Sequence, residues 1–574
     1  MASGKTLLMA CAAASSLWAQ SLPTGVTIEP FYDVEKAGLS FAKDQQSVVG
    51  MYEVPGKPQH FLVVGYFGYI WSLYPDTTRS YAKGAIKDYA KKQVADFNAW
   101  TMKGWEQGAL GGGFDPAFKS NRYFYVIYNK YADPSSYHGG VKPNGSDGPD
   151  NAGLVVVDRY RLSDDYAALV RDTTVFSAPH GTGYGSANLV FGKDGMMYIT
   201  ADSYSRNSWD STHLMRKILR IDVSRQDPGK MYAIPRDNPW YAAANPAVKK
   251  EVFAFGFRNT YSLQADYLTG SIWGGEVGQI LWEEVNIIKA GGNYGWGNGG
   301  DASPSGNNSI GIEGPCSPAL GGYTSSGSDT GSTGTAGQMT PYSRAYKGRT
   351  YTCADFTNGT WNFTHSGADA YGTKTSLAGT GVGCIILGPA FRGNPLSPFH
   401  GYHFVTDVAT NVFIAVKEGV AAPVKVGGVP STMAFAGDRY HNGITSFAED
   451  SYGNQYVGML SSSANGAFQW HDIYRLSHPQ LTPLEVPRGQ VVPEPGTVDL
   501  APGPYRWRRT GENGLATLLF LTGRTRVALP AGRSGVELFG LDGTRLWSGR
   551  GAPGTSLAVP GGLGSRAVRA RFQP

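Results

Sequence analysis

Several signatures of common enzyme classes are absent from this sequence. It has no HExxH zinc helix, no GxSxG nucleophile elbow and no GxxxxGK[ST] phosphate loop. Only 17% of its residues are charged, which argues against long amphipathic helices. No apolar run reaches the roughly 18 residues that a membrane-spanning helix needs. The sequence therefore gives no support to a zincin, an α/β-hydrolase, a P-loop enzyme or a helical membrane protein.

Glycine, proline and aromatic residues are abundant instead. The 574 residues include 78 Gly and 34 Pro, and 12% are aromatic. This composition is typical of many short strands joined by turns. Because the chain exceeds the roughly 100 to 200 residues of an average domain, we expect several domains or one large repetitive one. The predicted fold class is all-β.

The formal net charge of +5 comes from the C-terminal part of the chain. From Leu481 onward there are twelve Arg, no Lys and six acidic residues. These arginines are scattered through strand-like sequence, without the clustering or interleaved aromatics of a phosphate-tracking groove. A solvated face is favoured, and no nucleic-acid partner is expected.

The N-terminus has the pattern of a secretory signal peptide. Lys5 precedes an apolar run over residues 6–14, and small residues surround Ala19. Residues 1–19 are therefore predicted to be a signal peptide, and the protein to be secreted, extracellular or periplasmic. A lipobox-like sequence before Cys11 leaves attachment to the cell surface as an alternative.

Three further cysteines are Cys316, Cys353 and Cys384. In an oxidising compartment this odd number predicts one disulfide and one buried thiol, with the pairing open. Their wide spacing does not resemble a zinc site.

A turn followed by an apolar and aromatic strand recurs six times. These phrases start at Phe61, Phe114, Leu189, Asp266, Gly401 and Ala448. Six degenerate repeats of hairpin type predict a six-bladed β-propeller. The spacing between them is irregular because loops intervene, such as Gly300–Gly337, which is rich in Gly, Ser and Thr.

The composition changes after the last repeat. We expect the propeller over 25–476, a Pro-rich linker over 477–504 and a small C-terminal β-sandwich over 505–574. The last segment resembles the sorting domains of type IX secretion cargo, which implies a partner in the secretion machinery. A carbohydrate-binding or spacer domain is the alternative.

The stretch Ala254–Trp296 is the most informative part of the chain. It joins Arg258-Asn259, a Gly-Gln turn, the acid pair Glu283-Glu284 and the ending AGGNYGW. Such charges are costly to bury unless charged or polar groups meet them. This stretch therefore predicts a site.

The motifs FGFRNTYSL, GEVGQILWEEVN and AGGNYGW resemble the glucose/sorbosone dehydrogenase family, which includes soluble quinoprotein sugar dehydrogenases and Hedgehog-interacting-protein-like relatives. Further motifs, in the same order as in the family, extend the resemblance from about Gly25 to Pro479. It implies a six-bladed propeller whose top face holds pyrroloquinoline quinone (PQQ) beside Ca²⁺. Family membership alone does not decide activity.

The resemblance assigns the cofactor half of that site. Arg258 matches the Arg that stabilises charge on the quinone, and Asn259 would hold the cofactor's edge. Main-chain carbonyls at Gly278 and Gln279 match the calcium turn, because hard cations choose oxygen ligands. Glu283, in the acid pair, has either a metal-supporting role or a structural ion pair.

Three more positions match the family singly. Asp202 matches the acid that orients the catalytic histidine, and Glu106 matches a polar position above the quinone ring. Arg392 matches a basic residue that grips a cofactor carboxylate. Together they favour an anionic cofactor on a polar face.

The proton-abstracting half departs from the family pattern. The register before Leu189 places Tyr184 where the family has its catalytic histidine. His180, four residues upstream in a Gly-rich loop, is the candidate base. The ordinary pKa of a tyrosine is about 10, so Tyr184 could support catalysis only if its pKa were strongly lowered.

These observations predict a secreted dehydrogenase that uses PQQ and Ca²⁺ to oxidise an aldose or polyol hydroxyl. Its partners would be a small sugar and an external electron acceptor. The alternative is a catalytically silent propeller that binds glycans or proteins through its top loops. The retained Arg-Asn pair favours the first, and the replaced histidine favours the second.

Overall fold

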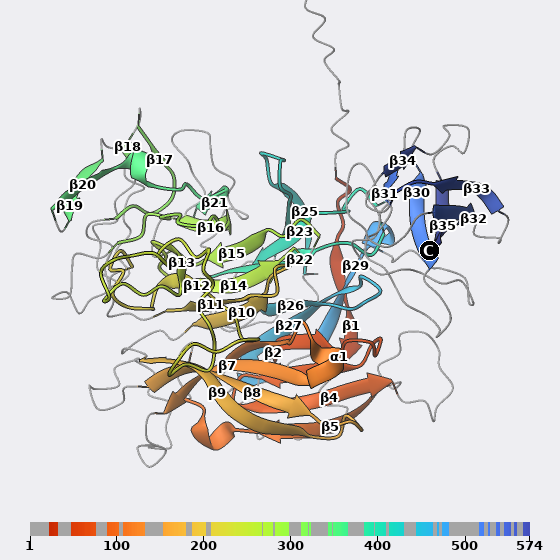
Figure 1. Ribbon diagram of the computed structural model, residues 1–574, viewed down its shortest axis with the longest axis horizontal. Coiled ribbons are helices and arrows are strands. Elements are labelled where there is room, and N and C mark those ends of the chain that lie inside the picture. Colours follow the sequence, from red (N-terminus) through yellow and green to blue (C-terminus); the bar gives the residue numbers. More distant parts are fainter. Residues whose placement is uncertain are drawn as a thin grey trace, which may run out of the picture.

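The computed structural model is built almost entirely of strands (Figure 1). It describes residues 22–32, 48–75, 89–102, 107–131, 153–179, 186–202, 208–266, 268–278, 282–297, 311–318, 321–322, 342–346, 348–364, 384–394, 397–408, 412–429, 443–462, 468–469, 473–481, 516–521, 526–528, 535–539, 545–552, 556–558 and 566–573. Its one described α-helix, α1, covers only Phe118–Asn121. Among the described residues, no helix has the length and apolarity needed to cross a membrane.

Five antiparallel sheets of four strands each follow one another along the chain, and each forms one blade. The first blade consists of β2 (Val48–Glu53), β3 (Phe61–Gly65), β4 (Tyr69–Pro75) and β5 (Tyr89–Asp96). The second consists of β6 (Ala109–Phe114), β7 (Tyr123–Tyr131), β8 (Gly153–Leu162) and β9 (Leu169–Pro179). The third consists of β10 (Ala187–Phe191), β11 (Met197–Ala201), β12 (Lys217–Ile221) and β13 (Val252–Phe255). The fourth consists of β14 (Thr260–Ala265), β15 (Ile272–Glu276), β16 (Trp282–Ile287) and β21 (Trp361–Thr364), and the fifth of β22 (Ile385–Ala390), β23 (His403–Asp407), β24 (Val412–Val416) and β25 (Val424–Gly428).

The sixth blade joins the two ends of the propeller. It contains β26 (Gly443–Glu449), β27 (Gln455–Ser462) and β29 (Ile473–Ser477), and its outer strand is β1 (Thr27–Tyr32) from the start of the chain. A short strand β28 (Phe468–Gln469) pairs with β27. Red β1 lies beside β29 in Figure 1, with Thr27 opposite Ser477. The prediction of a six-bladed propeller is confirmed, and the six sequence phrases fall one in each blade.

The innermost strands β2, β6, β10, β14, β22 and β26 contact one another around a ring and line a central cavity of about 550 Å³. Their alternating side chains pack between adjacent blades, which is the usual consequence of the two-residue strand period. We call the end where these strands begin the top face, and the end where they finish the bottom face.

The repeated phrases owe their form to an aspartate at the bottom face. In three blades it accepts a backbone N–H two residues later and a tyrosine hydroxyl from the next strand, at 2.8–3.0 Å. The three pairs are Asp115–Tyr125, Asp194–Tyr198 and Asp450–Tyr456. Each carboxylate thus caps a turn and fixes the following strand, which is a frequent use of Asp in turns.

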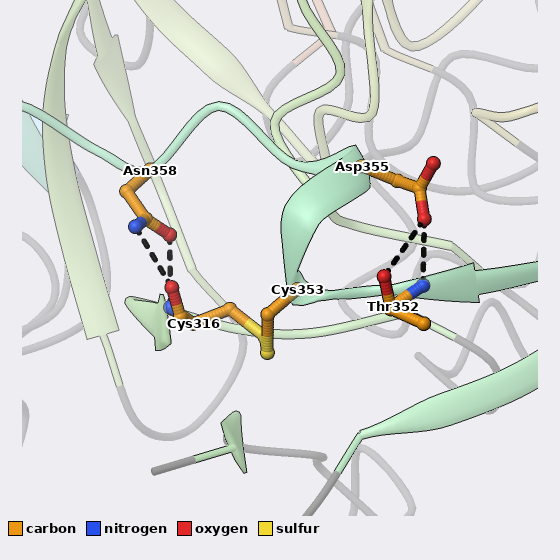
Figure 2. Close-up of a disulfide and its surroundings, with 5 residues drawn as sticks. All are labelled: Cys316, Thr352, Cys353, Asp355 and Asn358. Atoms are coloured by element: carbon orange, nitrogen blue, oxygen red, sulfur yellow. Dashed lines mark hydrogen bonds between the residues drawn. A yellow bond between two sulfur atoms is a disulfide. The ribbon is translucent and has the colours of Figure 1, made fainter. Parts of the chain in front are cut away.

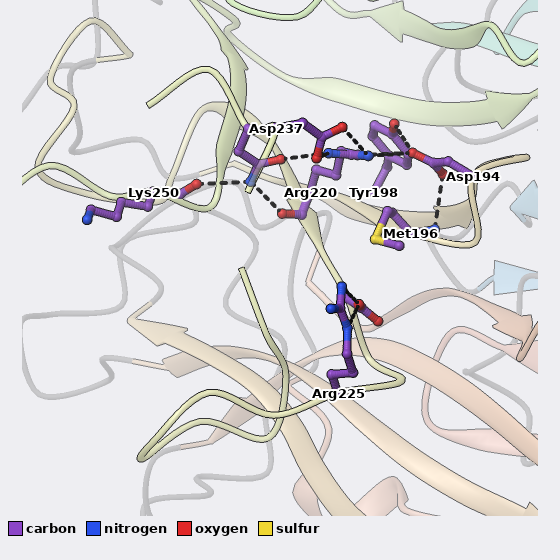
Figure 3. Close-up of polar contacts among 9 residues, drawn as sticks. Asp194, Met196, Tyr198, Arg220, Arg225, Asp237 and Lys250 are labelled. Atoms are coloured by element: carbon purple, nitrogen blue, oxygen red, sulfur yellow. Dashed lines mark hydrogen bonds and ion pairs between the residues drawn. The ribbon is translucent and has the colours of Figure 1, made fainter. Parts of the chain in front are cut away.

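A polar network extends this arrangement at the bottom of the third blade (Figure 3). Arg220 Nη2 lies 2.9 Å from Asp194, and its Nη1 lies 2.8 Å from Asp237. Asn238 donates to the carbonyl oxygens of Arg220 and Lys250 at 2.9 Å. These bonds hold the long connection between β12 and β13 against the blade.

The connection between β16 and β21 of the fourth blade is unusually long. It includes β17 (Cys316–Ser317), β18 (Gly321–Gly322), β19 (Ser343–Tyr346) and β20 (Arg349–Thr352), drawn in green at the edge of Figure 1. Near its start, Asn293 forms a parallel bridge with Phe255, the last residue of β13. Because β13 ends at the top face, the connection reaches that face. A disulfide joins Cys316 to Cys353, and Cys384 keeps its thiol. The predicted single disulfide is present, whereas the remaining thiol, predicted to be buried, is half-buried.

The C-terminal residues form strands as well. A four-stranded sheet has the order β30 (Ala516–Leu521), β35 (Arg566–Gln573), β32 (Gly535–Phe539), β33 (Arg545–Arg550), and β31 (Arg526–Ala528) pairs with β34 (Ser556–Ala558). The predicted sandwich packing and sorting role stay predictions. The signal peptide and most of the predicted linker lie outside the described residues.

Candidate cofactor site at the top face

The Arg-Asn pair directly precedes β14, the innermost strand of the fourth blade, and is held by one buried carboxylate. Glu276, at the end of β15, accepts the backbone N–H groups of Arg258 and Asn259 at 2.5 and 2.9 Å through Oε1. Its Oε2 accepts the Thr260 hydroxyl at 2.7 Å. Burial, together with the nearby charge of Glu284, raises the pKa of Glu276 to about 8. This carboxyl group therefore orients Arg258 and Asn259.

The Arg258 side chain lies at the mouth of the next turn. Its Nη1 donates to the Val277 carbonyl oxygen at 3.2 Å, and the guanidinium carbon lies 5.9 Å from the Trp296 ring. Arg258 is half-buried, whereas Glu276 and Val277 are buried. The partly accessible Arg258 guanidinium therefore lies beside Val277, the residue before Gly278. There it suits an anionic ligand.

The turn that starts at Gly278 closes tightly. A Cβ on Gly278 would overlap the Trp282 carbonyl oxygen, so only glycine fits there. Glu283 accepts the Gly278 N–H at 3.1 Å and the Ile385 N–H of the fifth blade at 3.0 Å. Glu283 therefore fastens the turn to the neighbouring blade.

The remaining donors of this corner suit a hard cation. Asn286 Nδ2 donates to Glu284 Oε2 at 3.1 Å, whereas Asn286 Oδ1 is buried and has no hydrogen-bond partner. Burial raises the pKa of Glu284 to about 7, and the charges of Glu313 and Glu283 add to this. In the described part of the chain no three His, Cys, Asp or Glu side chains form a metal group. A cation here would thus depend on main-chain oxygens, as oxygen-seeking Ca²⁺ allows.

Asp202 lies near this corner in a buried ion pair. Its Oδ1 is 3.0 Å from Arg216 Nε, and both side chains are at most 3% exposed. Arg216 has a left-handed backbone (φ 58°), which is uncommon for a non-glycine residue and frequent at functional sites. Burial lowers the pKa of Arg216, and the charges of Asp202, Arg258 and Glu276 also act on it. Arg216 therefore shares the electrostatic environment of Arg258.

Arg392 is not brought to this site. It is buried at the bottom face, where its Nη2 lies 2.6 Å from Asp266. Asp266 follows the last residue of β14, whereas Asn259 precedes the first. A six-residue strand, about 20 Å long, therefore separates the two positions. We leave Arg392 out of the cofactor site.

Four predicted residues lie outside the described residues, namely Glu106, His180, Tyr184 and Gln279. The structure also adds three that the sequence reasoning missed: Glu276, Arg216 and Glu313. Glu276 carried a signal, because an acid between two glycines and a valine in a strand is costly to bury without a purpose. Arg216 and Glu313 carried none, because their partners come from distant segments.

Comparisons with known proteins show which proteins this chain resembles. Residues 83–313 match the sequence model of the family described as Glucose / Sorbosone dehydrogenase. The HIPL1 protein of Arabidopsis thaliana is 28% identical over 265 residues, which are 38% of this chain and 37% of that protein. Quinoprotein glucose dehydrogenase B of Acinetobacter calcoaceticus is 26% identical over 208 residues, which are 34% and 40%. The chain thus spans about two fifths of the length of the relatives it matches.

The fold has solved counterparts. The soluble aldose sugar dehydrogenase of Escherichia coli, in its apo form, is similar over 79% of this chain and 99% of its own, with a TM-score of 0.51 and 17% identity. A glucose dehydrogenase structure gives a TM-score of 0.50 over the same shares, also with 17% identity. At this identity the likeness shows the fold alone. The family resemblance noted in the motifs is confirmed.

Proposed function

We propose that this chain, a relative of the glucose/sorbosone dehydrogenases, is a sugar dehydrogenase that uses PQQ and Ca²⁺ at the top face of its propeller. One observation carries the proposal. Arg258 is oriented by Glu276 and reaches the carbonyl oxygen next to the Gly278 turn. Anion-binding and cation-binding groups are therefore adjacent, as a calcium-bound anionic quinone needs.

The residues present fit both groups. Arg258 would hold the quinone side, because its guanidinium stays charged and donates directed hydrogen bonds. The Gly278 turn would offer main-chain oxygens to Ca²⁺, with Glu283 fixing the turn. Asn259 is kept in place beside Arg258 through its own N–H bond to Glu276. PQQ, when bound, accepts a hydride from the carbon that carries the oxidised hydroxyl.

The hydroxyl proton must pass to a base of this chain. We assign that role to His180, with Tyr184 as the alternative, on the family resemblance of the loop that contains them. The carbon loses a hydride and the oxygen loses a proton, so the alcohol becomes a carbonyl and two electrons leave for an external acceptor. Holding the base and Arg258 at the bound substrate would supply the catalysis.

The silent propeller has one specific observation in its favour. Asp202, which would orient a catalytic histidine, is bonded by Arg216 in a buried ion pair. A carboxylate engaged in this way is a poorer partner for an imidazole. Under this second candidate, the top face binds a glycan or protein without turnover.

The deciding experiment adds PQQ and Ca²⁺ to the purified protein. Quinone absorbance reports binding, and dye reduction with a panel of aldoses and polyols reports turnover. Binding with turnover supports the dehydrogenase, and a His180→Ala variant that kept the full rate would remove His180 from the mechanism. Binding without turnover favours the silent propeller. Absence of both binding and turnover contradicts the cofactor site itself.

We also propose that the protein acts outside the cytoplasm. The signal-peptide pattern over residues 1–19 and the oxidised Cys316–Cys353 pair support this location. The C-terminal strands are assigned to secretion or surface attachment on their resemblance to sorting domains.

A further inference from the structure

The long connection of the fourth blade supplies a segment that packs on the Gly278 turn. Gly311 N–H bonds to the Gly297 carbonyl, and Ile312 N–H bonds to the Gly295 carbonyl, both at 2.9 Å. Gly295 has a positive φ of 94°, and a Cβ there would overlap the Ile312 side chain. This segment is therefore fitted closely to the AGGNYGW motif.

Glu313 extends from that segment to the turn. Its Oε1 accepts the Trp282 N–H at 3.2 Å, and a Cβ on Gly278 would lie 2.9 Å from the same oxygen. Glu313 is only 4% exposed. Glu313 Oε1 therefore lies beside both Gly278 and Trp282.

The disulfide anchors the segment three residues after Glu313. Cys316 and Cys353 are buried, and Asn358 bonds both the N–H and the carbonyl oxygen of Cys316 at 2.8 Å (Figure 2). Cys316, Cys353, Ile312, Tyr342 and Trp209 form one hydrophobic cluster. The Cys316–Cys353 link closes a loop of 37 residues, which restricts the unfolded chain and the segment alike.

We propose that Glu313 is a positioning residue of the calcium turn and that the Cys316–Cys353 disulfide holds it in place. This inference rests on the proposed function, which assigns the cation to that turn. Glu313 fixes the Trp282 end of the turn by its hydrogen bond and adds negative charge beside the main-chain oxygens. Substituting a residue that orients the ligands of a metal typically lowers the metal affinity by roughly 10- to 100-fold.

The test measures cation binding by the full-length protein without PQQ. Tb³⁺ luminescence sensitised by the protein's tryptophans, with Ca²⁺ as competitor, reads out cation binding independently of catalysis. Glu313→Gln keeps an oxygen for the Trp282 N–H but removes the charge, so we expect Ca²⁺ affinity to fall by about tenfold or more. Glu251→Gln is the matched control, because Glu251 is a buried glutamate of the third blade bonded by Lys230 and Tyr232.

The disulfide is tested by a Cys316→Ser, Cys353→Ser double variant. We expect weaker Ca²⁺ binding with the propeller still folded, as checked by circular dichroism and thermal unfolding. Glu313→Asp should restore part of the affinity lost in Glu313→Gln, because it returns the charge.

The outcomes separate the two proposals. Ca²⁺ affinity of Glu313→Gln within twofold of the wild type, with wild-type binding intact, overturns the role of Glu313 and leaves the proposed function standing. If the wild type binds neither Tb³⁺ nor Ca²⁺, the calcium turn and this inference both fall.

Discussion

Two buried carboxylate sites, one at each face of the propeller, differ in the groups that meet their charge. At the bottom face, Asp266 meets Arg392 at 2.6 Å, and although burial alone raises the pKa of Asp266, Arg392 and His403 hold it below its usual value. At the top face, Glu276 and Glu284 bond to backbone amides, a hydroxyl and an amide side chain, and their pKa values rise. Asp266 is thus paired with a buried cation, whereas the Glu276–Glu284 site favours additional positive charge.

The largest expected effect comes from removing the cation that pairs with Asp266 at the bottom face. Arg392→Met leaves Asp266 buried without its guanidinium, which should cost about 3–5 kcal/mol of unfolding free energy. Urea unfolding measures the loss, and the Asp266→Leu, Arg392→Met double variant should recover much of it. PQQ and Ca²⁺ affinity should not change. Weakened PQQ binding with normal stability would instead return Arg392 to the cofactor site.

A second change tests the turn at the top face. Gly278→Ala places a Cβ against the Trp282 carbonyl, and overpacking of this kind costs about 1–3 kcal/mol. We expect lower thermal stability and loss of Ca²⁺ binding. Gly111→Ala is the control, because a Cβ there lies 3.4 Å from its nearest neighbour. Equal Ca²⁺ affinity in both variants would contradict the assignment of the turn.

The pH dependence of stability sharpens the contrast between the faces. The folded-state pKa of Glu276 is about 8, above the ordinary 4.5, so the folded chain holds this proton more tightly than the unfolded chain. Its contribution is complete below pH 4.5 and is lost as the pH rises toward 8, by at most about 1.4 kcal/mol per pH unit. In Ca²⁺-free buffer, Glu276→Gln should flatten this fall in melting temperature. An unchanged pH profile would mean that Glu276 is ionised in the folded protein.

The smallest expected effect concerns a single hydroxyl at the bottom face. Tyr456→Phe removes the 2.9 Å bond to Asp450 while the carboxylate keeps its backbone partners in the turn. We expect a loss of about 1 kcal/mol, the usual net value of one hydrogen bond. Thermal unfolding measures it, with Tyr198→Phe as the parallel change in the third blade. Cofactor affinity should stay the same in both.

The sequence predicts the blades well because each depends on local signals. A turn, an aspartate and an aromatic strand recur within about fifteen residues, so six phrases gave six blades. Arg258, Asn259, Gly278 and Glu283 were also found together, since all lie in or beside three consecutive strands of one blade, β14, β15 and β16. Local order was enough for that half of the site.

Other features depend on contacts between distant residues, and there the sequence failed. Arg392 follows the end of β22 instead of preceding its start, and only the strand direction places it at the opposite face. The pairing of Asp202 with Arg216 requires the register of β11 and β12. Glu313 reaches Trp282 across 31 positions through a connection whose path no motif indicates. Such tertiary partners leave no periodic signal.

The sixth blade has a consequence for the timing of biosynthesis. Its outer strand, β1, is made first, but its partner β29 ends at Ser477, and Arg475 bonds Glu29 across 446 positions. The ring cannot close while the ribosome is still translating the fifth blade. Until then, the growing chain has unpaired strand edges, which favour association with other chains. The propeller can therefore close only after its last blade has been made.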